Sequence, residues 1–179
     1  MNRRTPSFFM LVPGPWRDAV EVTRALSARG IPPEGKTGPG SFKIQIIEDD
    51  ALAAAFAWGR HGPLAKELIA RVGECSRAAL IEFSGLLHEQ AASVANLGRA
   101  LRDAGGVAIR MEASGAASAW EPWLERMQSR RASSIYESAV LLIHDDEGVV
   151  FTCGMHQFDL PEAQIAMSDA RDAMGWLDT

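Results

Sequence analysis

The chain has 179 residues, 47% hydrophobic and 23% charged, which is the composition of a globular protein and excludes a disordered chain. The net charge is −5 and positive charge clusters only at Arg3-Arg4 and Arg130-Arg131, so we expect no nucleic-acid binding. The two cysteines are too few for a disulfide-held secreted domain, and no apolar stretch reaches the roughly 20 residues of a membrane helix. We therefore expect a cytoplasmic protein without a membrane partner, folded as one domain over residues 1–179.

In the first half of the chain, strand and helix patterns alternate. Residues 7–12 predict a strand that ends at Pro13-Gly14-Pro15. The apolar run in this segment is too short for the core of a signal peptide. Residues 16–29 predict a helix, and the proline- and glycine-rich residues 31–41 predict a loop. The alternation that follows predicts a strand and two short helices, over residues 42–47, 50–58 and 63–72.

The second half begins with the clearest unit, a strand at residues 78–83, a long helical stripe from Leu87 to Ala104 and a strand at residues 107–111. Ser118 and Glu121 have the spacing of a capping box, which predicts a helix over residues 119–127 and a polar loop over residues 128–134. Two apolar runs around an acidic turn predict an antiparallel hairpin, and Pro161 predicts the start of a last helix. Together these elements predict an α+β fold, a mixed sheet with a C-terminal antiparallel hairpin and helices mainly on one face.

Several patterns that resemble functional motifs have simpler structural interpretations. Gly30 to Thr37 fits a phosphate-loop pattern, but a helix precedes it and Pro32 and Pro33 lack the N–H groups that hold phosphate, so we expect a surface loop and no cofactor. The acidic run from His144 to Glu147 lies where the hairpin must turn, so we expect no metal site. Cys153 and His156 are three residues apart on a predicted strand and would face opposite sides, which argues against a catalytic pair.

Two further features remain candidates for contact with a ligand or partner. Ser114 follows a strand, a position where α/β proteins often bind ligands, although a turn is the simpler interpretation. Trp120 and Trp123 lie on one side of a predicted helix and are candidate interface anchors.

The C-terminal half resembles a bacterial family known as domain of unknown function 4261. The resemblance rests on the segment from Thr152 to Glu162, of the form T-x-G-M followed by L-P-[DE], on Ile135-Tyr136-Glu137, and on the strand before Glu112-Ala-Ser114-Gly115. It covers roughly residues 78–179 and implies a shared fold without any transferable activity. The motif has a structural explanation, which we favour, and a functional alternative, in which side chains line one end of the sheet: Ser114, Tyr136, Glu137, Thr152, His156 and Glu162.

Three functions remain open from the sequence. The leading hypothesis is a non-enzymatic protein-binding protein, for example an immunity protein whose acidic residues complement a basic toxin. The second is an enzyme of hydrolase type with a dispersed site, built from Ser114, Tyr136, Glu137 and His156. The third is an assembly component that forms a homodimer through the hairpin edge or the helix of Trp120 and Trp123.

Overall fold

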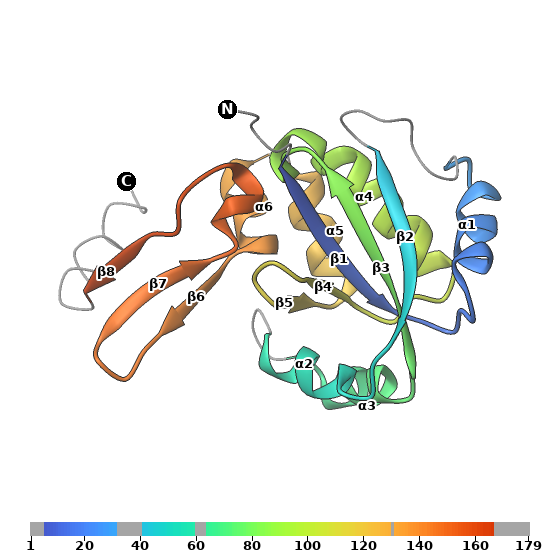
Figure 1. The fold of residues 1–179 in the computed structure, drawn as a ribbon, viewed down its shortest axis with the longest axis horizontal. Coiled ribbons are helices and arrows are strands. Elements are labelled where there is room, and N and C mark those ends of the chain that lie inside the picture. Colours follow the sequence, from blue (N-terminus) through green and yellow to red (C-terminus); the bar gives the residue numbers. More distant parts are fainter. Residues whose placement is uncertain (1–5, 32–40, 60–63, 130, 167–179) are drawn as a thin grey trace.

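The computed structural model describes residues 6–31, 41–59, 64–129 and 131–166. These residues form a five-stranded sheet covered by helices and a separate three-stranded sheet (Figure 1). The strands are β1 (Ser7–Pro13), β2 (Phe42–Glu48), β3 (Arg77–Ser84), β4 (Ile109–Met111), β5 (Ala116–Ser118), β6 (Leu141–His144), β7 (Val149–Cys153) and β8 (Gln164–Ala166). The helices are α1 (Ala19–Ser27), α2 (Leu52–Trp58), α3 (Lys66–Gly73), α4 (Leu87–Asp103), α5 (Trp120–Gln128), α6 (Ala132–Ala139) and the 3₁₀ turn η1 (Met155–Phe158).

The large sheet has the strand order β2-β3-β1-β4-β5, and neighbouring strands are antiparallel. Helix α1 joins β1 to β2, which run parallel to each other on either side of β3. Helix α4 joins β3 to β4, which run parallel on either side of β1. Two crossovers interleaved in this way form a split βαβ arrangement, into which α2 and α3 are inserted between β2 and β3.

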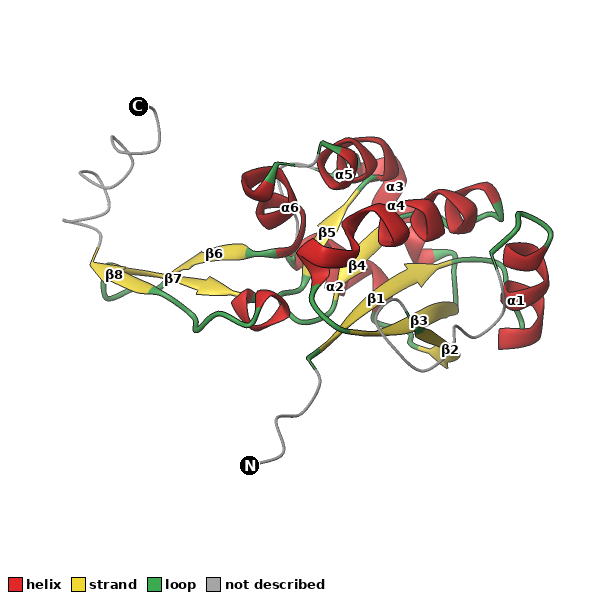
Figure 2. Cartoon of the chain, turned by 90° about the horizontal axis from the view of Figure 1, so that it is seen from above, coloured by secondary structure: helices red, strands yellow, loops and turns green. Residues whose placement is uncertain are grey.

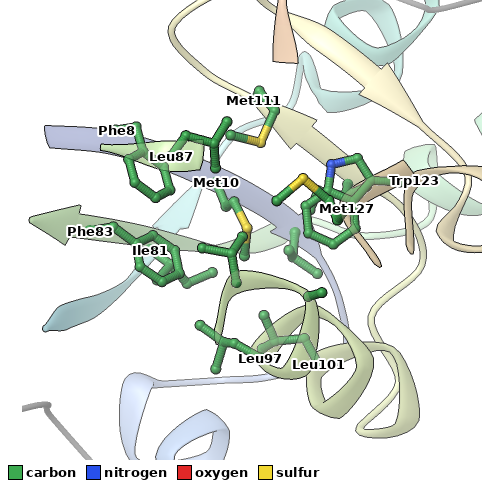
Figure 3. Close-up of a cluster of buried hydrophobic side chains, with 14 of the residues drawn as sticks. Phe8, Met10, Ile81, Phe83, Leu87, Leu97, Leu101, Met111, Trp123 and Met127 are labelled. Atoms are coloured by element: carbon green, nitrogen blue, oxygen red, sulfur yellow. The ribbon is translucent and has the colours of Figure 1, made fainter. Parts of the chain in front are cut away.

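Helices α1, α4 and α5 cover one face of the large sheet, while α2 and α3 pack against one end of the opposite face (Figures 1 and 2). The main core lies under α4, where side chains from β1, β3, α4 and α5 point toward one another (Figure 3). Phe8 and Phe83 stack across β1 and β3 with ring centroids 4.8 Å apart. The side of α4 that carries the predicted stripe is buried, including Val94 and Leu101 at 0% exposure.

The structure confirms the expected α+β class and the C-terminal hairpin, in which β6 and β7 flank the acidic turn. The sheet is not mixed: every pairing between described strands is antiparallel, because the parallel strands that each crossover joins are separated by another strand. None of the helices in the part of the chain that the structure describes is long and apolar enough to cross a membrane.

Two of the helix starts that differ from the prediction have a clear local cause. Helix α1 begins at Ala19 instead of residue 16, because the Asp18 carboxylate accepts a hydrogen bond of 2.9 Å from the N–H of Glu21 and so caps the helix there. The capping box at Ser118 does not form, since Ser118 belongs to β5 and pairs with Ile109. Helix α5 instead begins after Ala119 without a side-chain cap.

Two predictions near the C-terminus were wrong. The polar segment predicted as a loop over residues 128–134 contains the start of α6, which buries Ile135, Ser138 and Ala139. Pro161 does not open a helix: the N–H of Thr152 donates to the Ala163 carbonyl at 2.9 Å, and the chain continues as strand β8 on β7. The rest of that predicted helix, and residues 32–37 of the phosphate-loop pattern, lie outside the described residues.

Candidate functional site

The small sheet projects from the body of the molecule as an arm, defined here as residues 141–166 (Figures 1 and 2). Its strand order is β6-β7-β8, with Leu142 opposite Thr152 and Val150 opposite Ile165. Side chains alternate between the two faces of a strand, so Leu142, Thr152 and Ile165 lie on one face of the arm and Ile143 and Phe151 on the other.

Apolar side chains of the arm are exposed to an unusual degree. Five large hydrophobic residues are exposed among the residues that the structure describes, and three of them, Leu142, Leu160 and Ile165, belong to the arm. Leu142 is 62% exposed, and all of β8 is exposed. None of the described helices lies over either face of this sheet (Figure 2). Val150 lies on the same face as Leu142 and Ile165 and is buried at 7% exposure, but the exposed apolar side chains beside it form the kind of surface that marks an interaction site.

The base of the arm is organised around the carboxylate of Glu162. Its Oε1 accepts hydrogen bonds from the backbone N–H groups of Gly154 and Met155, both at 2.9 Å, and its Oε2 accepts one from the Thr152 hydroxyl at 2.8 Å. The His156 Nδ1 atom lies 3.5 Å from Oε1. Glu162 thereby ties the segment before β8 to the end of β7 and the start of η1.

These contacts set the charge state of Glu162. Burial disfavours the charged form, but the hydrogen bonds from Thr152, Gly154, Met155 and His156 outweigh it and hold the pKa of Glu162 below its ordinary value. Because its oxygens already accept these hydrogen bonds, the Glu162 carboxylate is suited to holding the backbone at the base of the arm in place. Glu162 of the T-x-G-M…L-P-E motif therefore has a structural role, but not the expected one at a helix start: it joins the segment before β8 to β7 and η1.

A tight backbone contact joins the arm to the body at Gly154. This residue has φ 109°, and a Cβ added there would lie 2.8 Å from the Ala139 carbonyl and 2.8 Å from the Ser114 Cβ. The buried side chain of Gln157 donates from Nε2 to the carbonyls of Ala139 and Gly154, at 3.2 and 3.1 Å. Only glycine fits this position, which explains its place in the motif.

An aromatic stack supports the same joint. The ring of Phe158, in η1, lies parallel to the ring of Tyr136 at 4.1 Å and is stacked at 5.9 Å on the ring of His88 from α4. Tyr136 is therefore part of the packing between α6 and η1. This packing of η1 against α4 and α6 fixes the direction in which the arm leaves the body.

The six candidate residues from the sequence do not converge on one site. Thr152, His156 and Glu162 come together at the base of the arm. Ser114 is 4% exposed and its hydroxyl accepts from the Ala116 N–H at 3.0 Å, so it organises the turn between β4 and β5. Glu137 lines a different cavity, of about 350 Å³ between α5 and α6, and lies 3.7 Å from Arg126.

The thiol and imidazole of Cys153 and His156 are directed at different partners. The Cys153 Sγ atom contacts the Ala113 carbonyl at 3.7 Å, while His156 faces Glu162. Burial, and next the negative charge of Glu162, raise the pKa of the Cys153 thiol, which keeps it protonated and weakly nucleophilic. Within the described ranges no three His, Cys, Asp or Glu side chains gather closely enough to hold a metal ion.

The two tryptophans expected as interface anchors are buried in the main core. Trp120 is 4% exposed and Trp123 is 1% exposed, and their rings meet edge to face at 6.0 Å. The Trp120 indole N–H donates to the Gly106 carbonyl at 2.7 Å. Neither residue is available to a partner, because the side of α5 that carries them faces α4.

Charge is unevenly distributed along the chain, a feature that the sequence-based predictions did not use. Residues 132–166 contain no Lys or Arg, so all 18 basic residues of the chain lie elsewhere. The same span carries the acidic residues Glu137, Asp145, Asp146, Glu147, Asp159 and Glu162. Counting charge by segment would have revealed an acidic C-terminal region, but the exposure of Leu142 and Ile165 required the structure.

Comparisons with known proteins found no match: no family model, no curated protein and no solved structure is similar to this chain at a meaningful level. The resemblance to the 4261 family therefore stays a prediction. The fold and the arm define the class of the protein only as an α+β protein with a split βαβ body and a projecting antiparallel arm.

Proposed function

We propose that the chain is a non-catalytic protein-binding protein and that the arm is its binding surface. The observation that carries this proposal is the exposure of apolar side chains on a sheet that no described helix covers. Exposing Leu142 and Ile165 to water is unfavourable, and a partner that covers them would remove that cost.

The charge of the arm supports a protein partner over the other classes. An exclusively acidic region repels the phosphates of nucleic acids and of anionic membranes, and it attracts a basic protein surface. An immunity protein that covers the basic active site of a toxin in the cytoplasm is the version of this role that we favour.

The two other hypotheses have less support. In an enzyme built from Ser114, Tyr136, Glu137 and His156, the first two pack beside η1 but are held in a buried turn and an aromatic stack, while Glu137 lies apart on α6. A homodimer through the hairpin edge would bring two acidic arms together, which like-charge repulsion opposes.

Affinity capture from the native host, read by mass spectrometry, tests the proposal when three baits are compared. Leu142→Glu places a charge on the arm, and Val20→Glu is the matched control, because Val20 is 61% exposed on α1. We expect a stoichiometric partner with the wild type and with Val20→Glu, and loss of that partner with Leu142→Glu. No partner with any bait, or a partner retained by Leu142→Glu, would contradict the proposal.

A further inference from the structure

Strand β6 presents an edge that no other described strand covers. It pairs with β7 along one side, and no strand among the described residues pairs with its other side. Soluble proteins usually protect such edges with charged residues, proline or a bulge, because free N–H and C=O groups invite another strand. Strand β6 reads Leu-Leu-Ile-His and has neither a charged residue nor a proline.

The surroundings of this edge are acidic. The turn that follows β6 carries Asp145, Asp146 and Glu147, which are all exposed. Glu137, in the helix that leads into β6, is 66% exposed. The region between Arg131 and Ala166 has no Lys or Arg of its own, so the three carboxylates of the turn have no basic neighbour within the arm, whereas Glu137 lies 3.7 Å from Arg126 of α5.

We propose that an extended, Lys- or Arg-rich segment of a partner protein adds to β6 as a fourth strand of the arm. Main-chain hydrogen bonds along β6 would supply affinity, and basic side chains beside the acidic turn would supply direction and selectivity. Alternate apolar side chains of the segment would cover Leu142 on one face of the arm, and the basic side chains between them would lie on the opposite face. This inference rests on the proposed function and specifies the chemistry of the partner.

A second copy of the chain is the weaker candidate for the same edge. Pairing two β6 strands would join two arms that each carry acidic residues and no basic residue, whereas a basic segment gains from the same charges. The acidic turn therefore favours a basic segment over a second copy of the chain as the strand that pairs with β6.

Selection from a random peptide-display library against the full-length protein tests the inference. We expect enrichment of peptides in which Lys or Arg alternates with Val, Ile or Thr. The variant Asp146→Asn/Glu147→Gln should weaken the binding of resynthesised peptides roughly fivefold, and added salt should weaken it further. The matched control Asp50→Asn/Glu67→Gln changes net charge equally on exposed sites of the body and should leave affinity within about twofold.

Backbone pairing is tested separately from charge. Peptides with N-methyl groups at alternate amides keep their charge but lose the donors that a strand needs, so we expect them not to bind. Equal binding by the methylated peptides, selection without enrichment of Lys or Arg, or no selected peptide would each overturn the inference. A dimer of the protein alone, seen by light scattering and lost in Leu142→Glu, would overturn it in favour of a second copy.

The capture experiment and the peptide library together show whether the strand pairing at β6 is wrong or the proposed function itself is wrong. If capture of a native partner depends on Leu142 while the library yields no basic strand-like peptides, the arm remains the binding surface and the edge pairing is wrong. If capture does not depend on Leu142, the proposed function itself is wrong.

Discussion

The body and the arm use similar apolar residues with opposite outcomes. In the body, strands such as β1 and β3 bury one face under α4, and Phe8 and Ile81 have 0% exposure. In the arm, Leu142 is 62% exposed and β8 is exposed throughout. A strand pattern therefore specifies a sheet but not what covers it. The covering layer of the body comes from its own helices, and we propose that the covering layer of the arm comes from a partner.

The largest expected difference between the two regions is in stability. Leu101→Ala removes a fully buried side chain from α4 and should lower the free energy of unfolding by about 2–5 kcal/mol. The same substitution at Leu142 removes a side chain that is mostly in water and should change it by less than about 0.5 kcal/mol. Urea denaturation of both variants measures this, and a large loss at Leu142 would mean that the free protein already covers the arm.

The joint between the two regions should be the next most sensitive position. Gly154→Ala forces a Cβ into the Ala139 carbonyl and the Ser114 side chain at positive φ, so we expect a loss of about 3 kcal/mol. Gly148→Ala, at the tip of the hairpin, also has positive φ but open space around it, and should cost about 1 kcal/mol. Similar losses for both variants would show that the close packing at Gly154 is unimportant.

The carboxylate at the base of the arm should give a smaller, pH-dependent effect. The pKa of Glu162 is lower in the folded protein than in the unfolded chain, so its stabilisation is present above the unfolded pKa of about 4.3 and is lost as the pH falls through the folded pKa. Glu162→Gln should cost about 1 kcal/mol at neutral pH, since the side chain is 41% exposed and solvent screens its interactions.

Urea unfolding of this variant and the wild type as a function of pH measures the effect. The difference should shrink below about pH 4, as the carboxyl group of the wild type becomes protonated. A difference that is constant from neutral to acidic pH would contradict a role for the negative charge.

The smallest expected effect concerns the two thiols, which lie in the two regions. Burial, followed by the charge of Glu74, raises the pKa of Cys75 in the body, and burial, followed by the charge of Glu162, raises that of Cys153 in the arm. Glu162→Gln should therefore speed alkylation of Cys153 by about twofold and leave Cys75 unchanged as an internal reference. Mass spectrometry of iodoacetamide-treated protein measures both rates, and faster alkylation at both sites would indicate general unfolding instead.

Local patterns were sufficient to predict most elements of the body. The apolar runs of β1 and β3 and the stripe along α4 predicted these elements because their burial follows the helix and strand periods. Helix α6 was missed because its first residues are polar and its buried face is short. Strand β8 was missed because Pro161 is favoured at a helix start, while the pairing with β7 depends on a contact ten residues away, between Thr152 and Glu162.

The candidate site was predictable only in part. Thr152, His156 and Glu162 belong to one motif, and spacing along the chain was enough to group them. The burial of Ser114 against Gly154 and the separation of Glu137 from this group depend on how the turn before β5 and α6 pack, which local sequence does not encode. Exposure of Leu142 likewise depends on the absence of a covering element in the described fold, a property of tertiary structure.

Photocrosslinking from the arm tests whether the arm is the surface that binds a partner protein. Benzoylphenylalanine placed at Leu142, with the same substitution at the equally exposed Val20 as control, is irradiated in native-host cells and the adducts are identified by mass spectrometry. We predict one dominant protein adduct from position 142 and none of that protein from position 20. Adducts of the same protein from both positions, or none from position 142, would contradict the assignment of the arm as the binding surface.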